Sequence, residues 1–298
     1  MKVALVTAIA AFALDEDLAP LQQALHAAGV QTQIVAWDDM TVSWGRFDAA
    51  LLRSTWDYTE RLGEFLAWAH QVEVQTKLFN PVDVVKRNVD KHYLAQLAKK
   101  KVAVVPSSFA EPGDDAGLAL DKFLKKYKDA EEFVAKPAIG AGSRDAQRYR
   151  RAQHAGAVAH IARLLAENRS VLLQPYLASV DELGETALMF FDGEFSHAIR
   201  KGPLLLADEG PTELLFAAET ITARTPGDDE LALARATLKA LDLKEPLLYA
   251  RIDLIRDAAG APRVLELELT EPSLFFPYGA GSAERFVAAL KRRLGHAG

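Results

Sequence analysis

The chain has no cysteine among its 298 residues. Disulfide bonds, thiol nucleophiles and cysteine-based metal sites are therefore excluded. None of its seven histidines stands in an H-E-x-x-H or similar spacing, which argues against a zinc site. No apolar run is long enough to cross a membrane, and the net charge of −6 argues against general nucleic-acid binding, which needs a basic face. We expect a cytoplasmic protein with neither a membrane nor a nucleic-acid partner.

The remaining composition is that of a globular protein, with 50% hydrophobic and 26% charged residues over a length that allows more than one domain. The N-terminus is open to two interpretations. Lys2 and the apolar run 3–14 resemble a short signal peptide. The alternative is a buried first strand over 2–7, followed by a small-residue loop and by an acidic cluster at 15–17 that opens a helix.

Strands and helices alternate over the first 80 residues of the sequence. Hydrophobic periodicity predicts strands at 3–6, 33–37, 47–53 and 77–81, and helices at 19–28 and 60–71. This alternation indicates a parallel α/β layer.

The rest of the chain mixes helices with strands and becomes largely β in its last third. Further helices are predicted at 91–101, 122–130, 155–168, 229–241 and 283–294, and strands at 102–106, 132–137 and 171–174. Two antiparallel pairs are predicted, 186–191 with 194–200 around an Asp192-Gly193 turn, and 249–256 with 264–269. The polar, irregular stretch 202–227 is typical of a lid or substrate loop.

A lysine and a glycine-rich loop follow a predicted apolar strand. Lys136 ends the strand, and the loop 140–143 comes directly after it. A lysine there can reach a phosphate, and glycines let the backbone approach phosphate oxygens. The spacing differs from the Walker A motif, since no G-K-[ST] follows the glycines. The alternative is a plain turn with a surface lysine. We predict phosphate contacts from Lys136 and from the loop residues Gly140, Gly142 and Ser143. A second lysine, Lys91 in the segment Asn88-Val89-Asp90-Lys91, is predicted to contact phosphate as well.

A group of carboxylates lies near the end of the chain. Asp253, Glu266 and Glu268 fall on two predicted antiparallel strands, where alternate side chains share a face. Like charges are costly to bury unless a cation intervenes, and carboxylate oxygens suit Mg²⁺. We therefore predict a magnesium site there, the alternative being the solvent-facing side of a half-buried strand. Arg251 shares the face of Asp253, where it can meet phosphate or a product carboxylate.

Two further segments are candidates for binding. Gln174, Pro175, Tyr176 and Leu177 look like a hinge between lobes, whose backbone groups can pair with an adenine edge, and Glu185 can accept hydrogen bonds from ribose hydroxyls.

Arg53, Thr55, Trp56 and Asp57 follow a parallel strand of the first domain, where ligands bind at the carboxyl ends. Together they offer a cation, a hydroxyl, an aromatic wall and a carboxylate, which suit a small amino-acid-like substrate. The alternative is a helix N-terminal loop with Thr55 or Asp57 as a cap.

The order and spacing of these segments resemble the ATP-grasp superfamily, in particular its glutathione-synthetase-like branch. The resemblance implies an α/β fold with α+β lobes: a parallel α/β pre-ATP-grasp substrate domain at 1–85, then two lobes at 86–174 and 175–298 that grip ATP. It assigns ATP phosphate contacts to Lys91 and Lys136, the hinge to 174–177 and the ribose contact to Glu185.

The same resemblance assigns Mg²⁺ to Asp253, Glu266 and Glu268, with Glu268 standing where the family often has Asn, and it allows Mn²⁺ instead. Arg200 falls where the family has an arginine aimed at the transferred phosphate. The catalytic residues predicted here are Lys136, Arg200 and Arg251. Family members are often dimers, so a homodimer is compatible with the resemblance.

Four segments resemble more closely the cyclo-ligases of D-cycloserine biosynthesis, which use ATP to close O-ureido-D-serine into a ring. These segments are residues 51–58, 184–186, 196–203 and 266–273. The hypothesis is an ATP-dependent ligase that activates a carboxylate as an acylphosphate, which an amine-type nucleophile of the same or another molecule then attacks. The alternatives are an intermolecular amino-acid or peptide ligase, a kinase, a nucleotide-binding protein without catalysis, and a binding protein that uses only its first domain.

Overall fold

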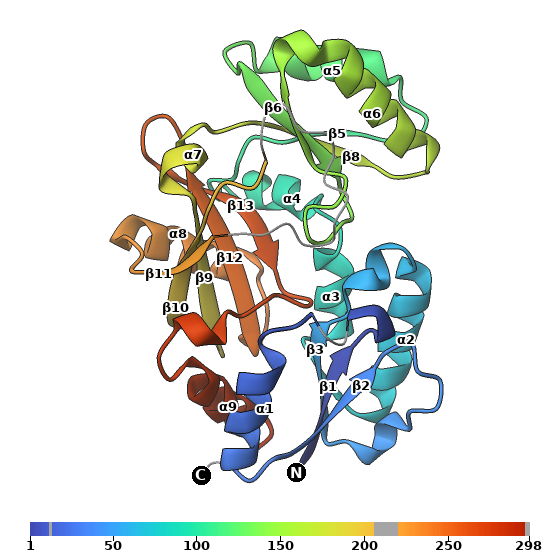
Figure 1. The fold of residues 1–298 in the computed structure, drawn as a ribbon, viewed down its shortest axis with the longest axis vertical. Coiled ribbons are helices and arrows are strands. Elements are labelled where there is room, and N and C mark those ends of the chain that lie inside the picture. Colours follow the sequence, from blue (N-terminus) through green and yellow to red (C-terminus); the bar gives the residue numbers. More distant parts are fainter. Residues whose placement is uncertain (12–13, 206–219, 296–298) are drawn as a thin grey trace.

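The computed structural model describes residues 1–11, 14–205 and 220–295. Its described residues form three sheets that follow one another along the long axis of the molecule (Figure 1). The first sheet lies at the end that carries both termini, the third lies in the middle, and the second lies at the opposite end. Among these residues, no helix combines the length and the apolar character that a membrane crossing needs.

The first sheet is parallel, as the alternation of strands and helices predicts. Its strands, in spatial order, are β2 (Gln31–Ala36), β1 (Lys2–Thr7), β3 (Ala49–Ser54) and β4 (Lys77–Phe79). Val3 and Leu5 of β1 pack toward α1 (Leu18–Ala27), whereas Ala4 and Val6 pack toward α2 (Leu62–Gln75). Successive side chains of a strand point to opposite faces, so β1 is buried on both sides and the run Lys2–Thr7 serves as an interior strand.

The second sheet is antiparallel and is covered on one face by two helices (Figure 1). Its strands, in spatial order, are β5 (Ser108–Ala110), β8 (Val171–Pro175), β6 (Glu132–Pro137) and β7 (Gln147–Arg150). The covering helices are α5 (Ala116–Lys126) and α6 (His154–Ala166). Asp115 caps α5, since its side chain accepts a hydrogen bond from the Leu118 amide at 2.8 Å.

The third sheet carries all three predicted magnesium residues, Asp253, Glu266 and Glu268. Its strands, in spatial order, are β11 (Ile221–Arg224), β10 (Glu194–Lys201), β9 (Glu185–Phe191), β12 (Tyr249–Arg256) and β13 (Pro262–Glu268). All neighbouring pairs are antiparallel. Asp192 and Gly193 join β9 to β10 with positive φ at both positions (53° and 82°), as a two-residue hairpin turn requires. The flanking helices are α7 (Ser179–Leu183), α8 (Asp228–Ala240) and α9 (Ser282–Arg293).

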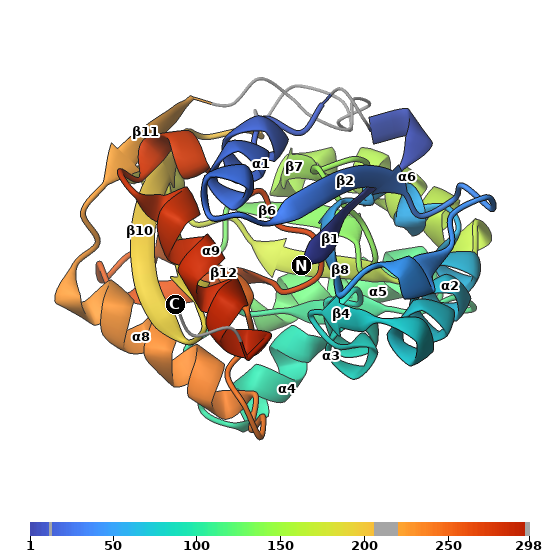
Figure 2. The same cartoon turned by 90° about the horizontal axis from the view of Figure 1, so that it is seen from below.

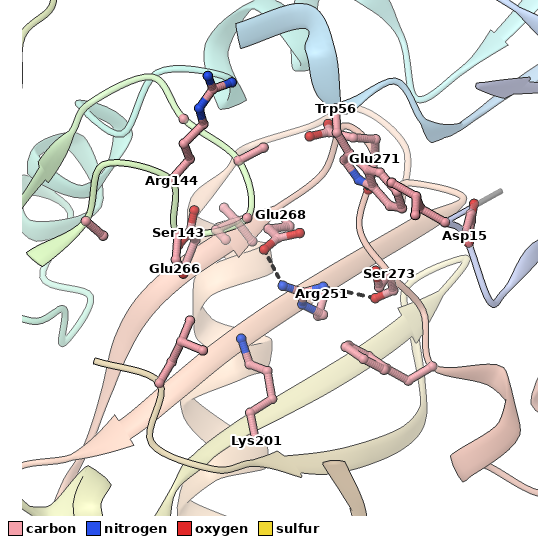
Figure 3. A pocket seen from close by; sticks show the side chains of 18 of the residues that line it. Asp15, Trp56, Ser143, Arg144, Lys201, Arg251, Glu266, Glu268, Glu271 and Ser273 are labelled. Carbon is pink, nitrogen blue, oxygen red and sulfur yellow. Dashed lines mark hydrogen bonds and ion pairs between the residues drawn. The ribbon is translucent and has the colours of Figure 1, made fainter. Parts of the chain in front are cut away.

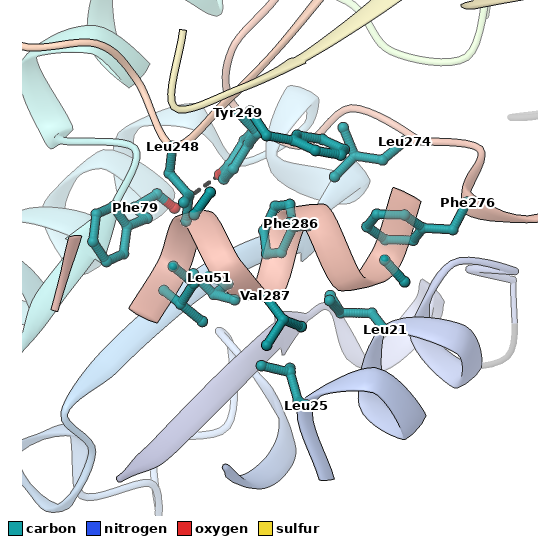
Figure 4. Close-up of a cluster of buried hydrophobic side chains, with 14 of the residues drawn as sticks. Leu21, Leu25, Leu51, Phe79, Leu248, Tyr249, Leu274, Phe276, Phe286 and Val287 are labelled. Atoms are coloured by element: carbon teal, nitrogen blue, oxygen red, sulfur yellow. Dashed lines mark hydrogen bonds between the residues drawn. The ribbon is translucent and has the colours of Figure 1, made fainter. Parts of the chain in front are cut away.

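The first and third sheets share one hydrophobic core (Figure 4). Helices α1 and α9 lie side by side (Figures 1 and 2), and Phe286 of α9 packs with Tyr249 of β12. The Tyr249 hydroxyl lies 2.8 Å from the Phe79 carbonyl and 2.9 Å from the Thr270 carbonyl. The N-terminal and C-terminal segments are therefore packed as one unit, and the division at 85 and 174 stays a prediction.

Short elements complete the described chain. Helices α3 (Val82–Asn88) and α4 (Tyr93–Lys99) connect the first sheet to the second. Single 3₁₀ turns lie at Ile9–Ala11, Trp44–Arg46, Trp56–Thr59, Arg151–Gln153 and Phe276–Tyr278.

Several elements differ from the sequence-based expectation. The predicted strand 102–106 is irregular apart from a single bridge between Val104 and Val264, and the strand forms later, at β5. Helix α5 begins at Ala116 rather than at 122, because Asp115 supplies its cap. Strand β7 and helix α3 were not predicted. Strand β11 interrupts the predicted irregular stretch 202–227, of which residues 206–219 lie outside the described residues.

Candidate active site

A cavity of about 530 Å³ lies where the three sheets approach one another (Figure 3). The first sheet contributes the segment before α1 and the turn after β3, and the second contributes the loop after β6. The third sheet contributes the ends of β10, β12 and β13 and the segment 271–278. This volume falls within the roughly 300–1,000 Å³ that is usual for small-molecule sites.

The antiparallel pair β12 and β13 brings the predicted carboxylates together. Asp253 lies opposite Glu266, and Arg251 lies opposite Glu268, all on one face. The register shifts directly after Asp253, so that the next residue, Leu254, pairs with Val264. This irregularity lets Leu254 and Val264 remain in the core while the charged residues face the cavity side.

Asp253 is a buried carboxylate that is fully paired with cations. Arg251 donates from Nε and Nη2 to its two oxygens at 2.9 and 3.0 Å, and Lys201 Nζ lies 2.8 Å from Oδ2. Burial by itself raises the pKa of Asp253, but the charges of Arg251 and Lys201 hold the pKa below its usual value. Asp253 is 1% exposed and does not line the cavity. Its partners Arg251 and Lys201 line the cavity in its place. It can bind a metal only if one of these cations releases an oxygen.

Glu266 is shared by the two predicted phosphate lysines. Lys91 Nζ lies 3.0 Å from Oε1, and Lys136 Nζ lies 3.6 Å from Oε2. Burial opposes ionisation of Glu266, yet the two lysines lower its pKa to about 2. Burial also lowers the pKa of Lys136, with Glu266 acting in the opposite direction. Both lysines line the cavity, so a bound phosphate would meet them directly.

The loop after β6 approaches the same lysines. Lys91 Nζ donates to the Gly140 carbonyl at 2.9 Å. Gly142 and Ser143 both have φ of 62°, a left-handed conformation that costs glycine little. Gly140, Gly142 and Ser143 line the cavity, as a phosphate-binding loop must. Arg144 of this loop forms an ion pair with Glu60 of the first sheet's turn region.

Lys201 is a cavity residue that the sequence analysis missed. It ends β10 and pairs with Glu185 and Asp253, each at 2.8 Å. Gly184 makes this position possible, since it has φ of 69° and a Cβ there would lie 2.3 Å from the Lys201 carbonyl. The expected catalytic residue Arg200 points elsewhere: its guanidinium donates to the carbonyls of Leu183 and Glu182. Because successive side chains of a strand alternate, the cavity receives Lys201 and not Arg200.

Two other carboxyls of the third sheet have perturbed acidity. Glu268 forms an ion pair with Arg251. Burial raises its pKa to about 7, with Arg251 opposing and Asp253 and Glu266 adding to the rise. Glu271 lines the cavity at 8% exposure. Burial and the charge of Glu268 raise its pKa to about 8.

The segment 271–276 forms the wall that faces the first sheet. Trp56 Nε1 donates to the Glu271 carbonyl at 3.3 Å, and Arg53 Nη2 donates to the Pro272 carbonyl at 3.0 Å. The Asp17 carboxylate accepts from the amides of residues 274–276 at 2.5 to 3.0 Å. The first domain therefore fixes this wall by side-chain bonds to its backbone.

Of the four residues predicted to bind substrate, only Trp56 lines the cavity. Arg53 and Thr55 are 0% exposed. Asp57 accepts from Trp37 Nε1 at 2.8 Å and pairs with Arg61. The Arg53 guanidinium is held under the wall 271–276 and does not line the cavity. Substrate contact at this strand end stays a prediction.

The predicted hinge and ribose residues lie outside the cavity lining. Gln174 is 2% exposed and donates from Nε2 to Ser107 Oγ at 3.1 Å. Tyr176 stacks under the Arg148 guanidinium at 3.6 Å and bonds to Asp181. Pro175 ends β8, and Leu177 packs with Val105 and Val180. Their contacts with a nucleotide, like that of Glu185, stay predictions.

The donor set fits magnesium that arrives with a nucleotide. Among the described residues, no group of three or more His, Asp or Glu side chains is arranged to hold a metal ion by itself. Mg²⁺ usually takes one or two protein carboxylates and completes its shell with phosphate oxygens and water. Glu266 and Glu268 line the cavity as such carboxylates, next to the lysines that suit phosphate.

Comparisons with known proteins agree over nearly the whole chain. The family model described as "D-cycloserine synthetase DcsG, N-terminal domain" matches residues 3–80. The cycloserine biosynthesis protein DcsG of Streptomyces lavendulae is 44% identical over 295 residues, which cover 98% of each chain.

Solved structures show the same relationship. The crystal structure of D-cycloserine synthetase DcsG matches with a TM-score of 0.93 and 43% identity, over 99% of this chain and 100% of that chain. D-alanine–D-alanine ligase from Bacillus anthracis matches with a TM-score of 0.66 at 14% identity, over 100% of both chains, which is a likeness of fold alone. The ATP-grasp ligase PsnB shows the same likeness of fold, with a TM-score of 0.66, 18% identity and 98% of both chains covered.

These matches confirm the expected α/β class and the ATP-grasp fold. They also confirm the resemblance on which the sequence analysis relied, and they establish the chain as an enzyme of the ligase type. The chain belongs to the DcsG family of ATP-grasp ligases.

Proposed function

We propose that this ligase uses ATP and Mg²⁺ to activate the carboxylate of a small amino-acid-like substrate as an acylphosphate, and that a nitrogen of the same molecule then closes the ring. The substrate we propose is O-ureido-D-serine and the product D-cycloserine, with the carbamoyl group of the ring nitrogen released as carbamate by water after ring closure. The 44% identity to a cycloserine biosynthesis protein supports the choice of substrate. The observation that carries the chemistry is the meeting of Lys91, Lys136 and Lys201 with Glu266 and Glu268 in one cavity.

The basic end of the cavity suits phosphoryl transfer. Lys91, Lys136 and Lys201 would neutralise the charge that develops on the transferred phosphoryl group. The backbone of 140–143 would approach phosphate oxygens. Glu266 and Glu268 would hold Mg²⁺, joined by Asp253 if Lys201 or Arg251 releases one of its oxygens, and the ion would supply charge neutralisation for the phosphates. Manganese offers the same preference for oxygen ligands.

The side of the cavity where Asp15 and Trp56 lie, away from Lys201, suits a small zwitterionic amino acid (Figure 3). The acidic side chain of Glu16 and the aromatic ring of Phe275 line the cavity as well. A substrate with an ammonium group would find carboxylates there. Its own carboxylate would be drawn toward the lysines at the other end, which is the orientation that activation requires.

The test is release of ADP and phosphate in the presence of ATP and Mg²⁺, with a panel of amino acids, dipeptides and O-ureido-D-serine. We expect turnover with O-ureido-D-serine alone, with D-cycloserine as the product. Turnover that needs two amino substrates would instead establish intermolecular ligation, and phosphorylated product without ring closure would establish a kinase. No turnover despite a melting temperature raised by ATP and Mg²⁺ would leave a binding protein only.

A further inference from the structure

Glu271 differs from the other buried carboxylates of the cavity. Asp253, Glu266 and Glu268 each pair with at least one lysine or arginine. Glu271 is as buried as a paired carboxylate, at 8% exposure, yet none of the ion pairs among the described residues involves it. A buried carboxyl without a cation is costly to ionise, so its retention at this point calls for an explanation.

The backbone around Glu271 is held firmly. Trp56 Nε1 donates to the Glu271 carbonyl at 3.3 Å. Arg53 Nη2 donates to the Pro272 carbonyl, and Arg251 Nη1 donates to the Ser273 carbonyl, each at 3.0 Å. Figure 3 shows Glu271 beside Trp56, with Arg251 between Glu271 and Lys201. The carboxyl is thus fixed at the substrate end, on the side away from Lys201.

Four groups act on the Glu271 carboxyl, and they come from four segments of the chain. The Tyr58 hydroxyl, itself 4% exposed, hydrogen-bonds with it from the turn after β3. The charges of Glu268 on β13, of Lys91 after α3 and of Arg251 on β12 also act on it. Burial first, and then Glu268, raise the pKa of Glu271 to about 8, while Tyr58, Lys91 and Arg251 oppose the rise.

This environment makes Glu271 a better proton acceptor than the other carboxylates of the site. Cations lower the pKa of Asp253 and Glu266, which makes both carboxylates weak proton acceptors. The Glu268 carboxylate is occupied by Arg251. A proton acceptor works best when its pKa lies near the working pH and when it is free to contact the reacting atom. Glu271 meets both conditions.

We propose that Glu271 is the general base of the second chemical step, with Tyr58 as the residue that positions its carboxylate. The inference rests on the proposed function. In that step the lone pair of the nucleophilic nitrogen forms a bond to the acyl carbon. The bond from that carbon to the phosphate oxygen breaks, inorganic phosphate leaves with the electron pair, and one N–H proton passes to the Glu271 carboxylate and then to water. The ring nitrogen still carries the carbamoyl group of O-ureido-D-serine. Water then adds to the carbamoyl carbon, the bond from that carbon to the ring nitrogen breaks, the nitrogen takes a proton, and carbamate leaves. The first step, attack of the substrate carboxylate on the γ-phosphorus, releases no proton and needs no base.

The two steps can be separated by trapping. Hydroxylamine reacts with an acylphosphate to give a hydroxamate without help from a protein base. With ATP, Mg²⁺ and O-ureido-D-serine, we expect E271Q to form hydroxamate within about threefold of the wild-type rate. Ring product formed without hydroxylamine should fall by about 10²- to 10⁴-fold, the usual contribution of a positioned base. E194Q is the matched control, because Glu194 is an exposed carboxylate at the start of β10 and does not line the cavity; it should change neither rate by more than about threefold.

The pH profile provides an independent readout of the same assignment. Ring closure by the wild type should rise with pH as Glu271 loses its proton. Y58F removes a hydrogen bond that lowers the pKa of Glu271, so the rising limb of its pH profile should move to higher pH. E271D should retain part of the rate, and its pH profile should still have a rising limb, set by the pKa of the aspartate. E271Q should lack the limb.

Three results would overturn the assignment. Wild-type ring closure by E271Q excludes a base role for Glu271. Loss of hydroxamate together with ring product, in an E271Q protein that melts at the wild-type temperature, assigns Glu271 to substrate binding or to the first step. If the wild-type protein forms no ATP-dependent hydroxamate, the proposed function is overturned, and the general-base role of Glu271 with it. This result differs from the other two because it is seen without any variant.

Discussion

Lys91 and Glu266 form an ion pair of 3.0 Å that joins the segment after α3 to strand β13. The same ammonium group donates to the Gly140 carbonyl at 2.9 Å. One lysine therefore connects the glycine loop of the second sheet to the carboxylates of the third. A nucleotide phosphate and its Mg²⁺ would compete for both partners of this pair, so binding is expected to replace an internal ion pair with charges of the ligand.

Loss of the Glu266 charge should abolish ATP turnover without unfolding the protein. In E266Q, Lys91 and Lys136 lose their common counter-charge and Mg²⁺ loses a ligand, so kcat for ADP release should fall by about 10²-fold or more. K136A and E266A should have the same effect. Circular dichroism and the melting transition would show that the fold persists. Full turnover by any of these variants would contradict the role assigned to that residue.

Lys201 and Arg200 form a matched pair of neighbours on opposite faces of β10. Lys201 neutralises Glu185 and Asp253 at the cavity, whereas Arg200 binds the carbonyls at the end of α7. K201M should therefore reduce ADP release by about 10²-fold or more, while R200M should retain turnover within about threefold. A K201M protein with wild-type kcat, or an R200M protein that is inactive yet folded, would restore the original expectation for Arg200. Melting temperatures of both variants exclude unfolding as the cause.

The elements predicted most accurately are those with a strong local signal. Strand β12 has the expected bounds, Tyr249–Arg256, because its apolar residues alternate with Arg251 and Asp253 as the pleat of a strand requires. The prediction of a turn at Asp192-Gly193 was also correct, because both positions need positive φ and these residue types adopt it. By contrast, β7 is a short polar strand, Gln147–Arg150, that is defined by its pairing with β6 and has no pattern of its own.

The wall at 271–276 and the cavity position of Lys201 escaped prediction, because both depend on packing between distant segments. Trp56 contacts the Glu271 carbonyl across 215 positions of sequence, so neither residue alone indicates the wall that they form. Whether Arg200 or Lys201 faces the cavity depends on which face of β10 each side chain lies on, and the register of β10 with β9 sets this. A signal for that phase existed in Gly184, since a glycine opposite the strand end marks a close backbone approach.

Magnesium alone should bind weakly, and magnesium with ATP should bind well. Asp253 and Glu266 are occupied by Arg251, Lys91 and Lys201, and the described residues offer no ready group of three metal ligands. Mg²⁺ without nucleotide should leave the melting temperature within about 1 °C, whereas ATP with Mg²⁺ at about 100 times its Kd should stabilise the folded state by about 2.7 kcal/mol. A large shift with Mg²⁺ alone would show that the carboxylates assemble a metal site by themselves.

His160 should make the protein less stable in mild acid. This residue of α6 is 6% exposed and packs against Tyr149, and neither ring nitrogen has a hydrogen-bond partner among the described residues. Burial, aided by the charge of Arg163, lowers the pKa of His160 to about 4. The unfolded chain takes up a proton near pH 6.5 while the folded protein remains neutral there. The free energy of unfolding should therefore fall by roughly 1–3 kcal/mol between pH 6.5 and pH 4.

The H160L variant isolates this contribution. Leucine cannot be protonated and leaves no buried nitrogen without a partner, so the variant should lose that part of the pH dependence and keep the rest. H70L is the control, since His70 is exposed on α2 and should leave the pH dependence unchanged. Urea unfolding at pH 7 and pH 4.5 gives the comparison for the three proteins. An H160L protein that loses as much stability as the wild type over this interval would show that the acid sensitivity arises elsewhere, in the carboxylates that Lys91, Lys201 and Arg251 keep ionised.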